Sequence, residues 1–141
     1  MPGKRPRLTP NPAIALRNGK PYMAFGTPGG DVQIQAMIQV FANCCCFDMP
    51  LQDAIDAPRF ASFSFPSSFA PNEHYPGLLK LEPGVHATTA EQLSALGHDV
   101  QWWPRLDWHA GGVCAIQVDD ADQRTLDAAA DPRRAGNADG R

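Results

Sequence analysis

The sequence has no long hydrophobic run, which excludes a membrane-spanning helix as the interpretation of any segment. A helix that crosses a bilayer needs about 20 consecutive apolar residues, and no apolar stretch in these 141 residues approaches that length. The basic residues near the start are not followed by an apolar stretch, so they do not form a secretory signal. We expect no membrane partner, and we favour the cytoplasm for the chain as it stands.

Paired cysteine spacings are also missing. Three of the four cysteines are consecutive, and the set is Cys44, Cys45, Cys46 and Cys114. Consecutive residues on a helix point about 100° apart and cannot all face one ion, and this spacing is not that of a disulfide framework. We therefore expect free, partly buried thiols, which favours a reducing compartment, and we expect no metal site and no cofactor.

Positive charge is scarce. The 12 basic residues are outnumbered by 15 acidic ones, so the formal net charge is −3 at pH 7. The basic residues that cluster do so near the two ends, and no basic stripe is interleaved with aromatic residues. This distribution excludes nucleic acid as an expected partner.

What the sequence does contain is enough apolar material for one domain at most. Hydrophobic residues make up 43% of the chain, and 14 prolines indicate many turns and loops. Residues 1–12 are rich in proline and basic residues and are predicted to be an extended arm. Residues 13–119 are predicted to form the domain, and residues 120–141 a polar C-terminal tail.

Within the domain, strands are expected in hairpins with helices between them. Asn18-Gly19 lies between two apolar runs, which is a strong hairpin signal. The first run is continuously apolar and is expected to be covered on both faces. The order predicts an α+β fold with a mainly antiparallel sheet. The expected strands are 13–16, 22–25, 59–65, 78–82, 99–103 and 112–119, and the expected helices are 32–46, 51–57 and 88–96.

The longest predicted helix, at residues 32–46, has apolar residues at helical spacing. We predict that this face packs on the hairpin strands and that Phe41 is among the most buried residues. The remaining polar residues are uncharged, so that side is also expected to be covered by protein. The apolar series is Ile34, Met37, Ile38, Phe41, Ala42 and Cys45.

The sequence Gly-Thr-Pro-Gly-Gly-Asp at residues 26–31 joins the hairpin to this helix. Gly29 and Gly30 permit positive φ and leave their backbone amides uncovered, and Asp31 is a suitable N-cap. N–H groups at a helix N-terminus can bind an anion or an oxyanion. A tight strand-to-helix turn without a functional role is the alternative interpretation.

Together, several motifs resemble the C-terminal part of the small subunit of gamma-glutamyltranspeptidases. This resemblance implies part of an Ntn-hydrolase fold, an αββα sandwich. It also implies a precursor that cuts itself to expose an N-terminal threonine, which attacks a γ-glutamyl amide such as glutathione and passes the acyl group to water or an amine. The motifs are residues 2–7, the hairpin, residues 26–31, residues 54–60, residues 96–100 and residues 130–134.

The resemblance assigns Gly29 and Gly30 to the oxyanion hole. It places the nucleophile upstream of these residues, since no threonine here opens the chain. A serine pair that holds the donor carboxylate in the family is replaced by Leu8 and Thr9, so only Thr9 keeps a hydroxyl as a candidate substrate-binding residue. We interpret Arg59 as structural, paired with Asp56, and expect Asp131 and Arg133 to anchor the tail.

The resulting hypothesis is a segment of a gamma-glutamyltransferase or hydrolase that carries the oxyanion hole and lacks the nucleophile. Its expected partners are an amide substrate and the large-subunit or upstream portion of the same precursor. Without that portion the chain should be inactive. The alternatives are a related amide acylase on the same fold, and a non-catalytic remnant or interaction module.

Overall fold

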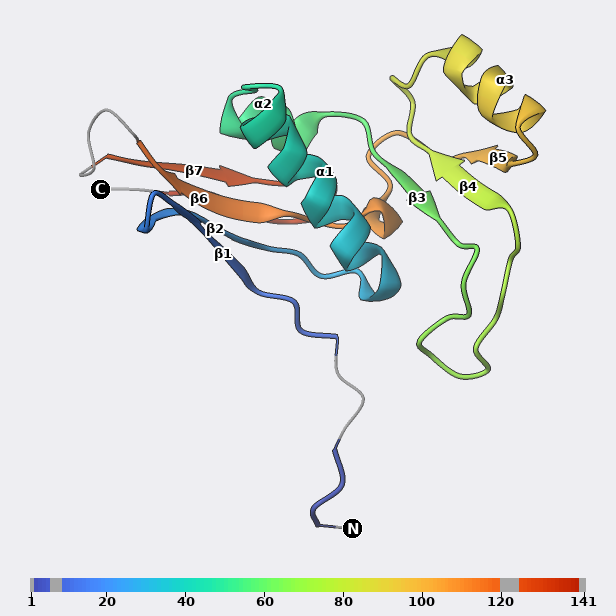
Figure 1. The fold of residues 1–141 in the computed structure, drawn as a ribbon, viewed down its shortest axis with the longest axis horizontal. Helices are drawn as coiled ribbons and strands as arrows, with labels where there is room; N and C mark the ends of the chain where they lie inside the picture. The colour runs from blue at the N-terminus through green and yellow to red at the C-terminus, as the bar shows by residue number, and fades with distance from the viewer. Residues whose placement is uncertain (1, 6–8, 120–124, 140–141) are drawn as a thin grey trace.

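The computed structural model describes residues 2–5, 9–119 and 125–139. A four-stranded antiparallel sheet runs in the order β1-β2-β6-β7, and a separate three-stranded sheet runs in the order β3-β4-β5 (Figure 1). The strands are β1 (Ala13–Arg17), β2 (Lys20–Gly26), β3 (Phe60–Ser62), β4 (Leu78–Leu81), β5 (Asp99–Trp102), β6 (Cys114–Val118) and β7 (Leu126–Ala130). The α-helices are α1 (Gln33–Cys46), α2 (Leu51–Asp56) and α3 (Ala87–Ala95), with short 3-10 turns η1 (Gly30–Val32) and η2 (Trp108–Ala110).

The first hairpin forms as predicted. Its two turn residues, Asn18 and Gly19, have φ values of 52° and 78°, the left-handed conformation that hairpin turns of this length require. β1 lies at the edge of the sheet, and Ile14 and Leu16 on it are exposed. The expectation that this strand is covered on both faces is therefore wrong for the described chain.

Helices α1 and α2 lie across one face of the four-stranded sheet (Figure 1). The main apolar core fills the space between them and the sheet, as expected for the helix that follows the hairpin. It consists of Tyr22, Met23, Ala36, Val40, Cys44, Leu51, Ala54, Ile55, Val113, Ala115 and Ala129.

The predicted buried face of α1 is out of phase with the observed one. Ala36, Met37, Val40 and Cys44 are buried, whereas Ile34 and Ile38 are 68% and 61% exposed. Phe41 is half-buried, with its ring stacked 5.6 Å from that of Phe25. The small side chains turn toward the sheet because they allow close approach of helix and strands, and the helix is apolar on more than one side.

The uncharged polar side of α1 joins the two sheets. Gln39 accepts a hydrogen bond from the Phe60 N–H and donates one to the Phe60 carbonyl. Gln35 makes the same pair of bonds with Ser62. The two side chains therefore satisfy the backbone of β3, as a neighbouring strand would. This confirms that the glutamine face is covered by protein.

The second sheet combines both strand directions. β3 pairs antiparallel with β4, and β4 pairs parallel with β5. Because parallel neighbours need a crossover connection, α3 lies between β4 and β5 in the chain, and it packs on this sheet through Leu79, Leu81 and Ala90. The sheets are antiparallel in the main, with this one parallel pair.

The segment predicted as a polar tail is part of the packed structure over residues 126–134. β7 pairs with β6 along its length, and Asp131 and Arg133 are buried. The strand was not predicted because its sequence is mostly alanine and aspartate, which have low strand propensity, and pairing with β6 overrides that propensity. Across the described residues, none of the helices has the length and hydropathy needed to cross a membrane.

Candidate active site

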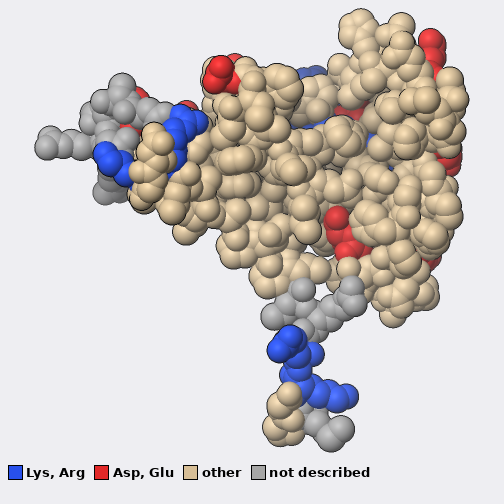
Figure 2. Space-filling model, viewed as in Figure 1, with Lys and Arg blue, Asp and Glu red and all other residues tan. Residues whose placement is uncertain are grey.

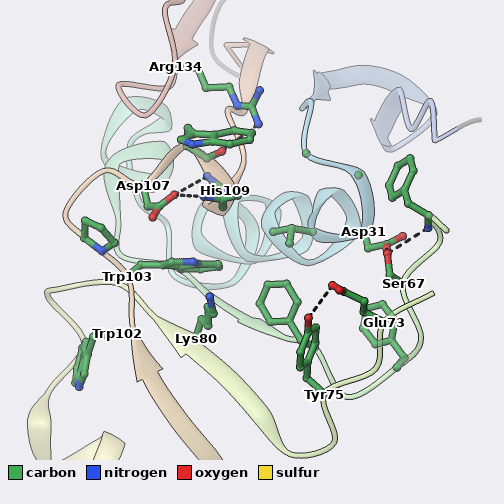
Figure 3. Close-up of a pocket in the computed structure, with 18 residues that line it drawn as sticks. Asp31, Ser67, Glu73, Tyr75, Lys80, Trp102, Trp103, Asp107, His109 and Arg134 are labelled. Carbon is green, nitrogen blue, oxygen red and sulfur yellow. Dashed lines mark hydrogen bonds and ion pairs between the residues drawn. The ribbon is translucent and has the colours of Figure 1, made fainter. Parts of the chain in front are cut away.

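A cavity of about 780 Å³ lies beside the turn that joins β2 to α1 (Figure 3). The glycine turn forms one wall, the loop between β3 and β4 forms a second, and the segment after β5 forms a third. The volume suits a small-molecule ligand. Its lining includes Gly29, Gly30, Phe63, Phe65, Phe69, Tyr75, Lys80, Trp102, Trp103, Asp107, Trp108, His109 and Arg134.

The two glycines have backbone conformations that other residues rarely adopt. Gly29 has φ 138° and Gly30 has φ 58°, and a Cβ on Gly30 would lie 3.0 Å from the Phe69 ring. Gly29 is the N-cap residue of η1. Within the described part of the chain, neither glycine N–H donates a hydrogen bond to another residue. Both amides are therefore available at a strand-to-helix junction beside the cavity.

Asp31 does not cap α1, contrary to the expectation from sequence. The N-cap residue of α1 is Val32, because the 3-10 turn η1 is inserted before the helix. The Asp31 carboxylate instead accepts hydrogen bonds from the Ser68 N–H at 2.7 Å and the Ser67 hydroxyl at 3.2 Å. It therefore ties the β3–β4 loop to the glycine turn (Figure 3).

The other side of the turn is held by Thr27. Its Oγ1 accepts a hydrogen bond from the Gly112 N–H at 2.7 Å and donates one to the Pro28 carbonyl at 2.7 Å. A Cβ on Gly29 would lie 3.6 Å from the Gly111 Cα, so the two glycine-containing segments are in contact. The segment that precedes β6 therefore supports the turn.

Replacing Thr27 by valine is expected to lower the free energy of unfolding by about 1–3 kcal/mol, because the buried Gly112 N–H loses its acceptor. Chemical denaturation of the two proteins measures the difference. Thr27→Ser is the matched control, since it keeps the oxygen and removes only a methyl group. A loss below about 1 kcal/mol in Thr27→Val would contradict the role assigned to the hydrogen bond.

Behind this support lies a buried network of two cations and two anions. Arg59 Nη2 lies 2.7 Å from Asp131 Oδ2, and Arg133 contacts Glu82 at 2.6 Å and Asp131 at 3.1 Å. All four residues are buried. Arg59 is structural, as expected, but its partner is Asp131 and not Asp56. Asp56 contributes to the network through its backbone carbonyl, which accepts from Arg133.

The network holds the segments around the turn in place. Arg59 donates to the carbonyls of Ala110 at 3.1 Å and Ile55 at 2.9 Å, and Asp131 accepts from the Val113 N–H at 2.8 Å. The segment that carries Gly112 is thereby held at both ends. The predicted role of Asp131 and Arg133 as anchors of the chain's last part is confirmed.

Burial and ion pairing have opposite effects on the pKa values of the two arginines in this network. Burial lowers the pKa of Arg59 below its usual value, although Asp131 acts in the opposite direction. For Arg133, burial alone would lower the pKa, but the hydrogen bonds and charges of Glu82 and Asp131 together outweigh it and raise the pKa. Arginine side chains stay protonated in proteins, so both residues carry their charge in this network.

An acid–histidine pair lines the cavity opposite the turn. Asp107 Oδ1 lies 2.6 Å from His109 Nδ1 and accepts the His109 backbone N–H at 2.8 Å. The His109 ring lies against Trp108, with centroids 3.8 Å apart. This pair was not among the site residues predicted from the sequence. The signal was the Asp-x-His spacing at the start of a short turn, where an aspartate caps and the second side chain folds back.

The structure separates Thr9 from this cavity. Thr9 is half-buried beside an adjoining hollow of about 530 Å³, which shares Gly30 and Asp31 with the main cavity. Leu8 lies outside the described residues. A role for Thr9 in substrate binding stays a prediction.

The cysteines are free thiols, as expected, and their exposure changes along the end of α1. Cys44 is buried, Cys45 is half-buried and Cys46 is exposed, while Cys114 is exposed on β6. Burial raises the pKa of the Cys44 thiol, and Cys45 adds to that effect. No cluster of His, Cys, Asp and Glu able to hold a metal ion occurs among residues 2–5, 9–119 and 125–139.

Comparison with known proteins gives a consistent result. The family model described as gamma-glutamyltranspeptidase matches residues 1–140. A glutathione hydrolase proenzyme of Pseudomonas aeruginosa is 32% identical over 135 residues, covering 96% of this chain and 22% of the relative. An oxamate amidohydrolase proenzyme of Klebsiella pneumoniae is 32% identical over 142 residues, covering 99% of this chain and 25% of the relative.

A solved structure matches almost the whole chain. It is a gamma-glutamyltranspeptidase from Pseudomonas nitroreducens complexed with L-DON, with 27% identity and a TM-score of 0.76, covering 99% of this chain and 66% of that chain. The chain spans about a fifth to a quarter of the length of the curated relatives.

Proposed function

Since this chain belongs to the gamma-glutamyltranspeptidase family and has an α+β Ntn-hydrolase fold, we propose that it supplies the oxyanion hole of an amide-cleaving enzyme. The nucleophile of that enzyme lies outside these 141 residues. The observation that carries the proposal is the pair of N–H groups of Gly29 and Gly30 beside the cavity, which donate to no other residue in the described part of the chain.

In the reaction, a threonine hydroxyl adds to the carbonyl carbon of the amide and gives its proton to a base, for which the threonine's own α-amino group serves. The carbonyl oxygen becomes an oxyanion, which the two glycine N–H groups stabilise by hydrogen bonds. The C–N bond then breaks, the amine leaves with a proton, and the acyl group remains as an ester on the threonine. Water or an acceptor amine releases it.

The threonine must come from elsewhere, because none of the threonines present here is suited to the role. Thr27 is used in supporting the turn, and Thr88 and Thr89 lie in the first turn of α3. Thr9 precedes β1 and Thr125 directly precedes β7. The expected partner is therefore the nucleophile-bearing portion of the same kind of precursor, as in the relatives that are proenzymes.

A γ-glutamyl amide such as glutathione is the first candidate substrate, in line with the glutathione hydrolase among the relatives. A different amide is the second candidate. It is favoured by Leu8 and Thr9 in place of the serine pair, and by the equal identity to an oxamate amidohydrolase.

The test supplies the nucleophile-bearing portion of a relative on a second chain and measures hydrolysis of a γ-glutamyl anilide and of simple amides. The chain alone should show no turnover, and the pair should. In the pair, Gly30→Ala is expected to lower kcat by about 100-fold or more, because strain and contact with Phe69 move the N–H away from the oxyanion.

Gly19→Ala is the matched control for that variant. Gly19 also has a positive φ, but it lies in the hairpin turn, where a Cβ would meet no other atom within 4 Å. The substitution therefore introduces similar backbone strain away from the cavity. Turnover by the chain alone, or an equal loss of kcat in both glycine variants, would contradict the proposal.

A further inference from the structure

The cavity wall is unusually aromatic, and this feature is independent of the glycine turn. The chain has three tryptophans, and all three line the cavity, together with Phe63, Phe65, Phe69 and Tyr75. Trp103 is buried and held edge-on to Phe63, with centroids 6.2 Å apart. Trp102 and Trp108 are exposed. A wall in which Trp103 is fixed by packing and other aromatic side chains are exposed is suited to binding a flat apolar group.

Lys80 provides a positive charge within this wall. Its side chain rises from β4 toward the cavity beside Trp103 (Figure 3), with Nζ 5.7 Å from the centroid of the Phe63 ring. Among the described residues, no carboxylate forms an ion pair with Lys80. Lys80 is a half-buried residue, so its side chain lies partly within the cavity wall.

The carboxylates of the wall already accept hydrogen bonds. Asp31 accepts from Ser67 and Ser68, Glu73 accepts from the Tyr75 hydroxyl at 2.7 Å, and Asp107 bonds His109. Arg134 donates to the Trp108 carbonyl at 3.0 Å, and its guanidinium lies 5.1 Å from the Trp108 ring centroid. Lys80 Nζ makes no hydrogen bond or ion pair with the described residues, so it can receive an anionic ligand.

We propose that this cavity is a subsite for an aromatic carboxylate, with the ring against the tryptophan and phenylalanine wall and the carboxylate on Lys80 Nζ. The inference rests on the proposed function, because it assigns the substrate as an amide in which one of the two portions carries an aromatic ring and a carboxylate. It adds a substrate class that the glycine turn alone does not define.

The test measures binding without turnover, so it does not depend on the nucleophile. Phenylacetate is titrated into the full 141-residue chain, and tryptophan fluorescence is excited at a wavelength that the ligand does not absorb. Every tryptophan lines the cavity, so the signal reports on this site. Phenylacetate should bind more tightly than acetate, which lacks the ring, and more tightly than phenylacetamide, which lacks the charge.

Lys80→Met is expected to raise the Kd for phenylacetate by about tenfold, since it removes one charge-assisted contact, and to leave the Kd for phenylacetamide unchanged. The matched control is Lys20→Met, which changes an exposed lysine of the hairpin. Circular dichroism and the fluorescence of the free variants verify that the fold is kept.

Three outcomes would overturn the inference: no saturable response to phenylacetate, equal binding of phenylacetate and phenylacetamide, or tighter binding of the cationic phenylalanine amide, which would assign the site to the carboxylates. None of these outcomes bears on the glycine N–H groups. Conversely, loss of turnover in the two-chain assay with normal phenylacetate binding would contradict the proposed function and leave the subsite standing.

Discussion

Replacing Asp131 by asparagine is expected to lower the free energy of unfolding by about 3–5 kcal/mol, because it removes one charge from a buried network and leaves two buried arginines with a single carboxylate. Asp131 accepts from Val113 N–H, Arg133 N–H and the guanidinium groups of Arg59 and Arg133. An asparagine has one acceptor oxygen, and its NH2 group would face a donor. Urea denaturation followed by circular dichroism measures the change.

The control is Asp127→Asn. Asp127 lies on β7, ahead of Asp131, and is exposed, so the same chemical change should alter the free energy of unfolding by less than about 0.5 kcal/mol. A second measurement separates local from global effects. Exchange of the Gly112 amide hydrogen should accelerate in Asp131→Asn, since the segment that bears it loses its anchor at Val113. A loss below about 1 kcal/mol would contradict the structural role assigned to the network.

The second prediction concerns the exposed apolar surface. Ile34 and Ile38 on α1, with Ile14 and Leu16 on the edge strand β1, expose large apolar side chains, and surfaces of this kind associate in water. The wild-type chain is expected to elute from a sizing column as an oligomer or aggregate. The double variant Ile34→Glu with Ile38→Glu should shift the main species to the monomer, without loss of stability, because neither side chain is in the core.

Figure 2 shows one face of the molecule in space-filling form, where uncharged surface covers most of the body and charged side chains are sparse. Leu96→Glu is the control for the shift. Leu96 is 79% exposed at the end of α3, on the helix that packs on the second sheet, so its replacement should leave the elution volume unchanged. If the wild-type chain elutes as a monomer, the prediction is wrong. If Leu96→Glu has the same effect as the double variant, association is not specific to α1.

The elements that the sequence predicted well are those whose signals are local. The Asn18-Gly19 turn, the helix at residues 33–46 and the glycine turn all depend on backbone preferences of adjacent residues, and the structure has them in the expected places. The prediction of which face of α1 is buried was wrong, because periodicity cannot distinguish between two apolar faces of one helix. Whether Ile34 or Ala36 faces the sheet depends on how closely the helix approaches the strands. That distance is set by residues far away in the sequence.

In the candidate site, too, features set by adjacent residues were predicted, and features that depend on distant residues were not. The positive φ values of Gly29 and Gly30 were predicted because they follow from residue type, and their role in an oxyanion hole stays a prediction. Arg59 was recognised as structural, but its partner was assigned to the neighbouring Asp56 instead of Asp131, since only the fold brings β7 beside α2. The tryptophan wall and Lys80 were missed for the same reason. Lys80 lies on β4 and Trp103 directly follows β5, and only the β4–β5 pairing shows that these two side chains lie beside one cavity.

The contacts that hold the glycine turn involve residues much later in the sequence, so during translation they form after the turn itself has been synthesised. Chains emerge from the ribosome N-terminus first, so the turn is made before the segments that support it. Thr27 can accept its hydrogen bond from Gly112 only after that residue, 85 positions later, has been synthesised. Likewise, β2 can pair with β6 only once β6 has been synthesised. Arg133, which reaches back 78 positions to Ile55, comes later still. A nascent chain that stops before residue 112 contains both glycines and none of these supports. The glycine turn is thus synthesised before the residues that hold it, and its full set of supporting contacts can form only after Arg133 has been translated.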